Sequence, residues 1–181
     1  MLTEISRLVL AMTLLTGLVS CGPSEPLVAT DFRESPGAGG WRPMEAAGSA
    51  GRVIWAPPAS RADDGAITIQ RGQLLSPAFA QEPFQYYRLA FRARSGDRYY
   101  WFGRFYNPDG DELAADHVSA ADPSADWQAH EYAFRGRLNA QTARISFAPQ
   151  KKPVALDQVL IEPVDDAWVQ QWSQSVYATV P

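Results

Sequence analysis

Alternation of apolar and polar side chains is clearest in the middle of the chain, over residues 84–94. The apolar members of this segment are Tyr87, Leu89, Phe91 and Ala93, each separated from the next by one residue. Because successive side chains of a strand point to opposite faces of a sheet, this period of two predicts a strand with one buried face. A turn at residues 95–97 then leads into the nearly all-aromatic segment 98–106, which we expect to pair with it.

Shorter segments of the same kind recur along the rest of the chain. Strands are predicted at residues 28–32, 52–55, 66–69, 127–135, 143–147 and 154–161. Turns rich in Gly, Pro and Asp separate most of them. One convincing helix follows, opened by Asp165 and Asp166, whose negative charges suit a helix N-terminus. Many short strands and a single helix predict an all-β sandwich over residues 28–164, with a C-terminal helix and tail over residues 165–181.

A short apolar run occupies residues 8–19. A membrane-spanning helix needs about 20 apolar residues, so this run instead predicts the hydrophobic part of a secretion signal at residues 1–20. The segment that ends it, Leu18-Val19-Ser20-Cys21, resembles the lipobox of bacterial lipoproteins. That resemblance implies a lipid on Cys21 after cleavage. The alternative is an ordinary signal peptide cut near Ser20, which would leave Cys21 as a free thiol.

Two further features bear on the lipoprotein interpretation. Cys21 is the only cysteine of the chain, so no disulfide within the chain explains it. Residues 21–27 contain Gly and Pro and are predicted to form a flexible tether. In the lipoprotein family, Asp after the lipidated Cys favours retention in the inner membrane of many Gram-negative bacteria. Gly22 stands there instead, so we expect a protein of the cell envelope anchored in the outer membrane.

Composition excludes one class of partner. The chain has a formal net charge of −4, which gives no electrostatic footprint for nucleic acid. After the signal and tether about 150 residues remain, enough for one domain with a substantial core. The acidic residues Asp109, Asp111, Glu112 and Asp116 cluster after the turn at residues 107–110, and we interpret them as a solvated loop.

Three segments resemble the galactose-binding-like jelly roll, the fold of many carbohydrate-binding modules. They are the opening Asp31-Phe32-Arg33-Glu34, the strand Tyr86-Tyr87-Arg88-Leu89-Ala90-Phe91-Arg92-Ala93, and the closing strand Leu156-Asp157-Gln158-Val159-Leu160-Ile161. The resemblance implies a jelly-roll β-sandwich. It also implies a structural Ca²⁺ held by Glu34 and Asp157, although Gln158 replaces a second acid that is common in the family. The alternative is that Asp157 caps a turn and that Arg33 pairs with an acid.

A sugar site needs exposed aromatic rings and planar hydrogen-bonding groups. The candidate ligand-binding residues are Trp41, Trp55, Tyr86, Arg88, Tyr100, Arg104 and Arg144. We place Tyr86, Arg88, Tyr100, Arg104 and Arg144 on one wet face, flanked by loop residues Trp41 and Trp55. If Arg104 points outward, Tyr100, Phe102 and Tyr106 point outward with it. The alternative is that the C-terminal helix covers this aromatic face with Trp168 and Trp172.

The sequence contains no recognisable catalytic motif. His117 and His130 are its two histidines and lie on separate predicted elements, outside metal-ligand spacing. The tail 172–181 resembles the linker that precedes the catalytic domain of some SGNH-type hydrolases, but no Gly-Asp-Ser nucleophile block is present. We therefore expect a non-catalytic, membrane-anchored domain that binds a polysaccharide. The alternatives are a structural lipoprotein that binds a cell-envelope protein, or the accessory part of a hydrolase whose catalytic domain is absent.

Overall fold

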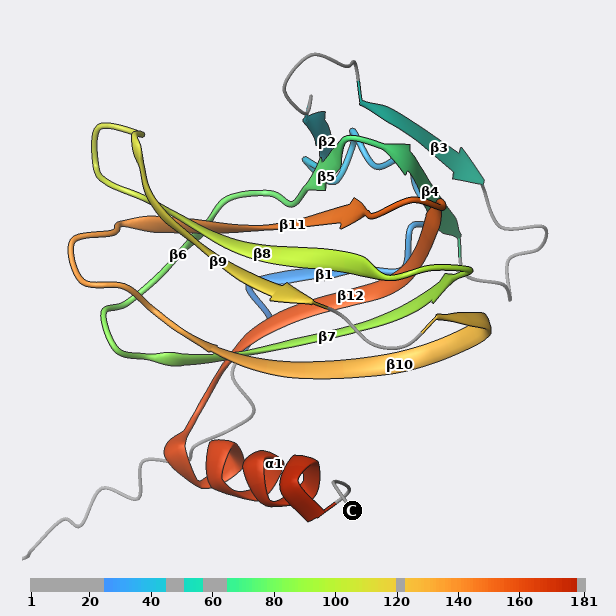
Figure 1. Cartoon of the computed structure of the whole chain (residues 1–181). Coiled ribbons are helices and arrows are strands. Elements are labelled where there is room, and N and C mark those ends of the chain that lie inside the picture. Colours follow the sequence, from blue (N-terminus) through green and yellow to red (C-terminus); the bar gives the residue numbers. More distant parts are fainter. Residues whose placement is uncertain (1–24, 45–50, 57–64, 120–122, 179–181) are drawn as a thin grey trace, which may run out of the picture.

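Two antiparallel sheets pack face to face in the computed structural model (Figure 1), which describes residues 25–44, 51–56, 65–119 and 123–178. Sheet A has the order β10-β7-β12-β4-β3, with β1 paired to β12. Sheet B has the order β2-β5-β11-β8-β9, with β6 paired to β11. This arrangement confirms the predicted all-β jelly-roll sandwich.

The strands of sheet A are β1 (Val28–Thr30), β3 (Arg52–Ala56), β4 (Ala66–Arg71), β7 (Tyr86–Ser95), β10 (Ser124–Arg135) and β12 (Val154–Val164). Those of sheet B are β2 (Arg42–Met44), β5 (Gln73–Leu75), β6 (Phe79–Ala80), β8 (Tyr99–Tyr106), β9 (Glu112–Ser119) and β11 (Thr142–Pro149). The expectation of a solvated acidic loop was wrong for Glu112 and Asp116, because both lie on β9, which pairs along β8.

The core lies between the two sheets and is built from the predicted alternating residues. Sheet A contributes the β7 residues Tyr87, Leu89, Phe91 and Ala93, and sheet B contributes Tyr99, Trp101, Phe105, Ala143, Ile145 and Phe147, all buried. The rings of Phe91 and Phe147 meet edge to face, with centroids 5.0 Å apart, and so join the sheets. Inward residues of β7 and β8 therefore hold the sandwich together, and the residues between them point outward. The expected pairing of segment 98–106 with segment 84–94 was wrong, because β7 belongs to sheet A and β8 to sheet B.

Phe32 organises the N-terminal corner of the core. Its φ of 52° lies in the left-handed region, and its ring meets Trp41 edge to face at 5.4 Å. The indole N–H of half-buried Trp55 donates a hydrogen bond of 2.8 Å to the carbonyl of Phe32. Trp41 is only 3 % exposed. The expectation that Trp41 flanks a binding face from a loop was therefore wrong, because the ring fills the core beside Phe32.

The helix α1 (Asp166–Ala178) lies on the outer side of sheet A, away from sheet B (Figure 1). Asp165 begins it by accepting a hydrogen bond of 2.8 Å from the backbone N–H of Trp168. The rings of Trp168 and Trp172 stack at 6.2 Å, and Trp172 donates its indole N–H to the carbonyl of Glu131 on β10. The alternative that this helix covers the aromatic face of residues 98–106 was wrong. No helix in the described residues is long and apolar enough to cross a membrane.

Candidate functional site

Aromatic side chains form a row along the outer face of β8. Tyr100, Phe102 and Tyr106 are half-exposed and alternate with the buried residues of the same strand. The rings of Tyr100 and Phe102 lie 6.4 Å apart. In sheet B, β8 lies between β11 and the edge strand β9, and β2 forms the opposite edge (Figure 1). We call these three residues the β8 aromatic row.

Arg104 lies within this row and is held by four hydrogen bonds. Its guanidinium donates to both carboxylate oxygens of Glu112 at 2.7 and 2.9 Å, to the side-chain carbonyl of Gln73 at 2.8 Å, and to the hydroxyl of Ser146 at 3.1 Å. It also lies 5.6 Å from the ring centre of Phe102. The Arg104 side chain is 12 % exposed and that of Glu112 is 36 % exposed. Arg104 therefore fixes the geometry of Glu112 and Gln73, and Glu112 is the more accessible of the two charges.

Arg144 extends the polar part of the face from the neighbouring strand β11. Its guanidinium donates a hydrogen bond of 2.7 Å to the carbonyl of Ser76. Burial and, next, the positive charge of Arg42 lower the pKa of Arg144. Burial and, next, the negative charge of Glu112 raise the pKa of Tyr106. Tyr106 therefore keeps its phenolic proton at neutral pH and can donate a hydrogen bond.

The arrangement suits a polyhydroxylated ligand with apolar C–H faces. Aromatic rings supply rigid apolar area at low cost in side-chain entropy. The guanidinium, carboxylate and amide groups of the Arg104 network supply planar donors and acceptors in fixed positions. A few oriented polar groups beside an apolar surface are typical of small-molecule and sugar sites.

The seven sequence candidates do not form one surface. Tyr100, Arg104 and Arg144 lie together on the outer face of sheet B. Tyr86 and Arg88 point to the outer face of sheet A, on the opposite side of the sandwich. Their placement beside Tyr100 was therefore wrong, because alternation within a strand does not say which sheet the strand joins. Gln73 and Glu112 were missed, since neither follows an aromatic or motif signal.

Arg88 is engaged within its own sheet. It donates a hydrogen bond of 2.7 Å to Glu162, forms an ion pair with Glu131, and lies 5.8 Å from the ring centre of Trp168 on α1. Burial alone lowers the pKa of Arg88, but the hydrogen bond with Glu162 and the charge of Glu131 raise it overall. Arg88 therefore joins β7, β10, β12 and α1, and paired acids balance its charge beneath the helix.

The two expected calcium ligands have different surroundings. Asp157 is 4 % exposed and accepts a hydrogen bond of 3.2 Å from Arg92, whereas Glu34 lies in an exposed bend. Within the described ranges, no three His, Cys, Asp or Glu side chains gather as a metal-ligand set. The structure thus supplies Arg92 as a counter-charge for Asp157, and calcium at Glu34 and Asp157 stays a prediction.

His130 lies at the edge of the core on β10. Its ring stacks on Phe91 with centroids 5.1 Å apart, and burial lowers its pKa. His117 lies on β9, and its side chain is outside the described part of the chain. Cys21 also lies outside the described residues, so lipid attachment there stays a prediction.

Known structures share the fold, whereas no protein-family model and no curated protein matches the chain. A xylan-binding CBM22-1 domain of Paenibacillus barcinonensis Xyn10C superposes with a TM-score of 0.55 at 12 % identity, over 79 % of this chain and 97 % of that domain. A CBM4 structure superposes with a TM-score of 0.50 at 22 % identity, over 77 % of this chain and 95 % of that chain. The enzymatically active domain of bacteriophage CBA120 tailspike protein 4 superposes with a TM-score of 0.60 at 14 % identity. The match covers 78 % of this chain but only 21 % of the tailspike chain. At these identities the likeness establishes the jelly-roll fold of carbohydrate-binding modules.

Proposed function

We propose that this chain is a non-catalytic glycan-binding domain whose binding surface is the outer face of sheet B. The β8 aromatic row beside the fixed Arg104 network carries this proposal, because it joins apolar rings to oriented polar groups. The fold shared with carbohydrate-binding modules supports it. The xylan-binding neighbour makes xylan one of the first ligands to assay.

A glycan array with matched tyrosine variants tests this proposal. The mature chain with Cys21→Ser should bind at least one polysaccharide saturably. Tyr100→Ala should weaken that binding about tenfold or more, as expected for an aromatic anchor at the centre of an interface. Tyr86→Ala is the control, because Tyr86 is also a half-exposed outward tyrosine but lies on sheet A. Equal losses in both variants, or binding to no polysaccharide, would refute the assignment to sheet B.

We further propose that a lipid on Cys21 holds the domain at the cell envelope, in the outer membrane. The apolar run at residues 8–19, the small residues before Cys21 and the proline-containing tether after it support this. One acyl chain binds a membrane only reversibly, whereas two or three anchor firmly. Cells given labelled palmitate should incorporate it into the wild-type chain and not into Cys21→Ser. A labelled Cys21→Ser variant would show that the lipid is attached elsewhere.

A further inference from the structure

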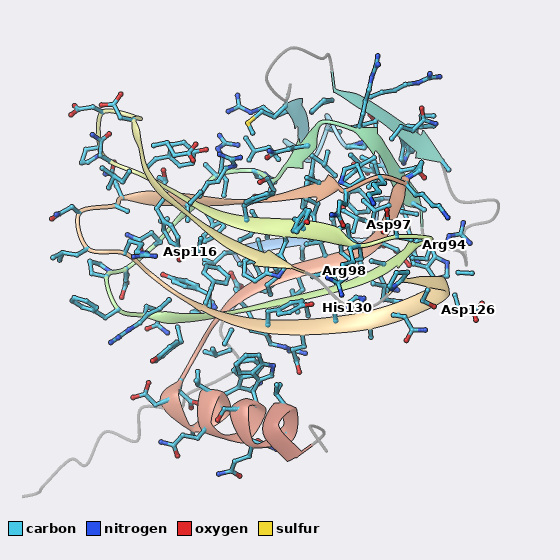
Figure 2. The ribbon with its side chains drawn as sticks, viewed as in Figure 1. Arg94, Asp97, Arg98, Asp116, Asp126 and His130 are labelled. Atoms are coloured by element: carbon cyan, nitrogen blue, oxygen red, sulfur yellow. The ribbon has the colours of Figure 1, made fainter. Side chains whose placement is uncertain are left out.

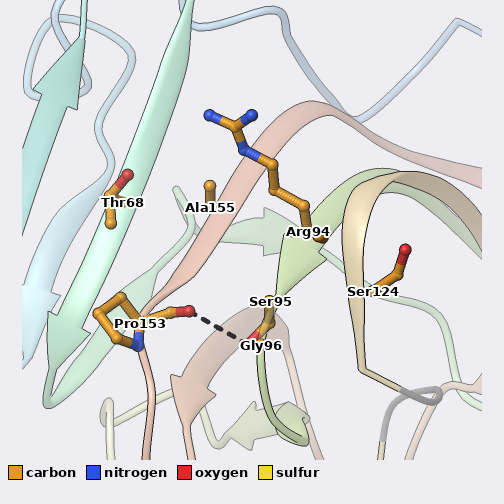
Figure 3. Close-up of a pocket in the computed structure, with 8 residues that line it drawn as sticks. Thr68, Arg94, Ser95, Gly96, Ser124, Pro153 and Ala155 are labelled. Atoms are coloured by element: carbon orange, nitrogen blue, oxygen red, sulfur yellow. Dashed lines mark hydrogen bonds between the residues drawn. The ribbon is translucent and has the colours of Figure 1, made fainter.

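A cavity of about 290 Å³ opens on sheet A, at the end of the sandwich where β7 turns into β8. It is lined by residues of β4, β7, β10 and β12, by Gly96 in the turn after β7, and by Pro153 just before β12. Its polar side chains are those of Thr68, Arg94, Ser95 and Ser124. Figure 3 shows the Arg94 side chain extending between Thr68 and Ser124. The volume lies just below the usual range for ligand pockets, roughly 300–1,000 Å³. The Arg94 cavity, as we call it, therefore suits a group of about one sugar ring.

Arg94 differs from the other two arginines on the outer face of β7. Arg88 pairs with Glu131 and Glu162, and Arg92 pairs with Asp157. Arg94 is exposed, and among the described residues no acid pairs with it; its guanidinium lies 4.8 Å from the ring centre of Trp127. Because that contact is cation–π, it positions the guanidinium without neutralising it. The planar fork of donors thus stays available for a carboxylate.

Hydroxyl groups flank this guanidinium. Ser124 Oγ accepts hydrogen bonds from the backbone N–H of Asp126 at 3.1 Å and from the Gln128 amide at 3.4 Å. Its own O–H can therefore donate to a ligand. Ser95 is already engaged, because its hydroxyl donates to the carbonyl of Pro153 at 3.1 Å. Thr68 supplies a second hydroxyl from the opposite wall (Figure 3).

The surrounding charge favours an anion. Figure 2 shows Arg94 and Arg98 at this end of the sandwich together with Asp97 and Asp126. Lys152 also reaches this end, because its side chain lies against Gly96. The charged residues described here are the bases Arg94, Arg98, Lys151 and Lys152 and the acids Asp97 and Asp126. Among these described residues four bases stand against two acids, in a chain whose formal net charge is −4.

We propose that the Arg94 cavity is a second binding site, for a sugar unit that carries a carboxylate. Arg94 receives the carboxylate, Trp127 holds the guanidinium in place, and the hydroxyls of Thr68 and Ser124 contact the ring hydroxyls. This site extends the proposed glycan function to acidic sugars. It lies on sheet A and uses none of the residues of the outer face of sheet B, so each site can fail without the other.

Titration of the mature Cys21→Ser chain with D-glucuronate, followed by amide NMR shifts, tests this site. The amides of Ser95, Gly96 and Ser124 should shift to saturation. D-glucose and acetate should each bind about tenfold more weakly or worse, because each lacks one half of the recognised chemistry. Acetate binding as tight as glucuronate would reduce the site to an adventitious anion site and overturn the proposal.

Three variants complete the test. Arg94→Gln should weaken glucuronate binding about tenfold or more, as expected for a lost charge-assisted contact. Arg98→Gln removes the same charge from an exposed arginine that does not line the cavity, and it should bind like the parent chain. Tyr100→Ala should also keep glucuronate binding, whatever it does to polysaccharide binding. Parent-like binding by Arg94→Gln, or equal losses in the two arginine variants, would overturn the proposal.

Discussion

Replacing Trp41 by Ala should destabilise the fold rather than remove a ligand contact. The indole is 3 % exposed, meets Phe32 edge to face at 5.4 Å and stacks on Phe147 at 6.4 Å. Truncating a buried Trp costs about 3–5 kcal/mol through lost transfer energy and a residual cavity. For a domain of this size each kcal/mol shifts the melting temperature by about 2–4 °C, so the expected loss is roughly 6–20 °C.

Urea and thermal unfolding followed by circular dichroism measure this loss. Trp127→Ala is the matched control, because Trp127 is half-exposed on the outer face of sheet A and contacts the guanidinium groups of Arg92 and Arg94. Its removal should cost about 1 kcal/mol or less. If Trp41→Ala has the same melting temperature as Trp127→Ala but no longer binds polysaccharide, the core assignment is refuted and Trp41 is a ligand residue.

Three further predictions concern Gly65 beside Phe32, His130 at the edge of the core, and calcium binding at Asp157. Gly65→Ala would place its Cβ 1.8 Å from the carbonyl of Phe32, so it should lower the urea midpoint far more than Gly37→Ala, whose Cβ would meet nothing nearer than 4.0 Å. Burial lowers the pKa of His130 in the folded chain. As the pH falls below about 6.5, the unfolded chain therefore binds a proton at this residue before the folded chain does. The free energy of unfolding should decrease over the pH range from about 6.5 down to the folded-state pKa. His130→Phe should flatten that part of the profile, and an unchanged slope would contradict the cause given. If calcium binds at Asp157, chelator should lower the melting temperature and Asp157→Asn should abolish the effect; an unchanged melting temperature leaves Arg92 as the counter-charge.

The inner faces of the strands could be read directly from the sequence. Alternation over residues 84–94 and 143–147 identified the buried side, because a strand with one wet face must place its apolar residues on the other. The same rule correctly predicted that Phe102 and Tyr106 point outward if Arg104 does. These predictions depend only on local geometry, so they needed no knowledge of the partner strands.

The composition of the outer surfaces could not be read in the same way. Tyr86 and Tyr100 look alike along the chain, yet they lie on opposite sheets because β7 pairs with β12 whereas β8 pairs with β11. Which strand pairs with which is decided by contacts between residues far apart in sequence. Trp41 was misplaced for a related reason, since a Gly- and Pro-rich segment gives no periodicity that would show its indole packing on Phe147.

A lipid on Cys21 would give the domain and its two proposed sites a definite orientation at a membrane. The backbone N–H of Leu27 donates a hydrogen bond of 2.8 Å to Ile161, so the chain enters the sandwich along sheet A near the end of β12. Cys21 lies four residues before Glu25, a span of at most about 14 Å. A lipid on Cys21 would therefore hold this end, where α1 also begins, close to the bilayer.

An anchor at Cys21 would leave both proposed sites accessible. The β8 aromatic row lies on sheet B, whereas the chain enters along sheet A, so a lipid on Cys21 would leave this row on the sheet opposite the anchor. Arg94 lies eight residues along β7 from Tyr86, which is about 26 Å at the rise of a β-strand. Because Tyr86 pairs with Val164 at the end where the chain enters the sandwich, the Arg94 cavity would lie at the end farthest from a lipid on Cys21. A long anionic polysaccharide could then contact the outer end and the open face of a domain that a lipid on Cys21 anchored at its opposite end.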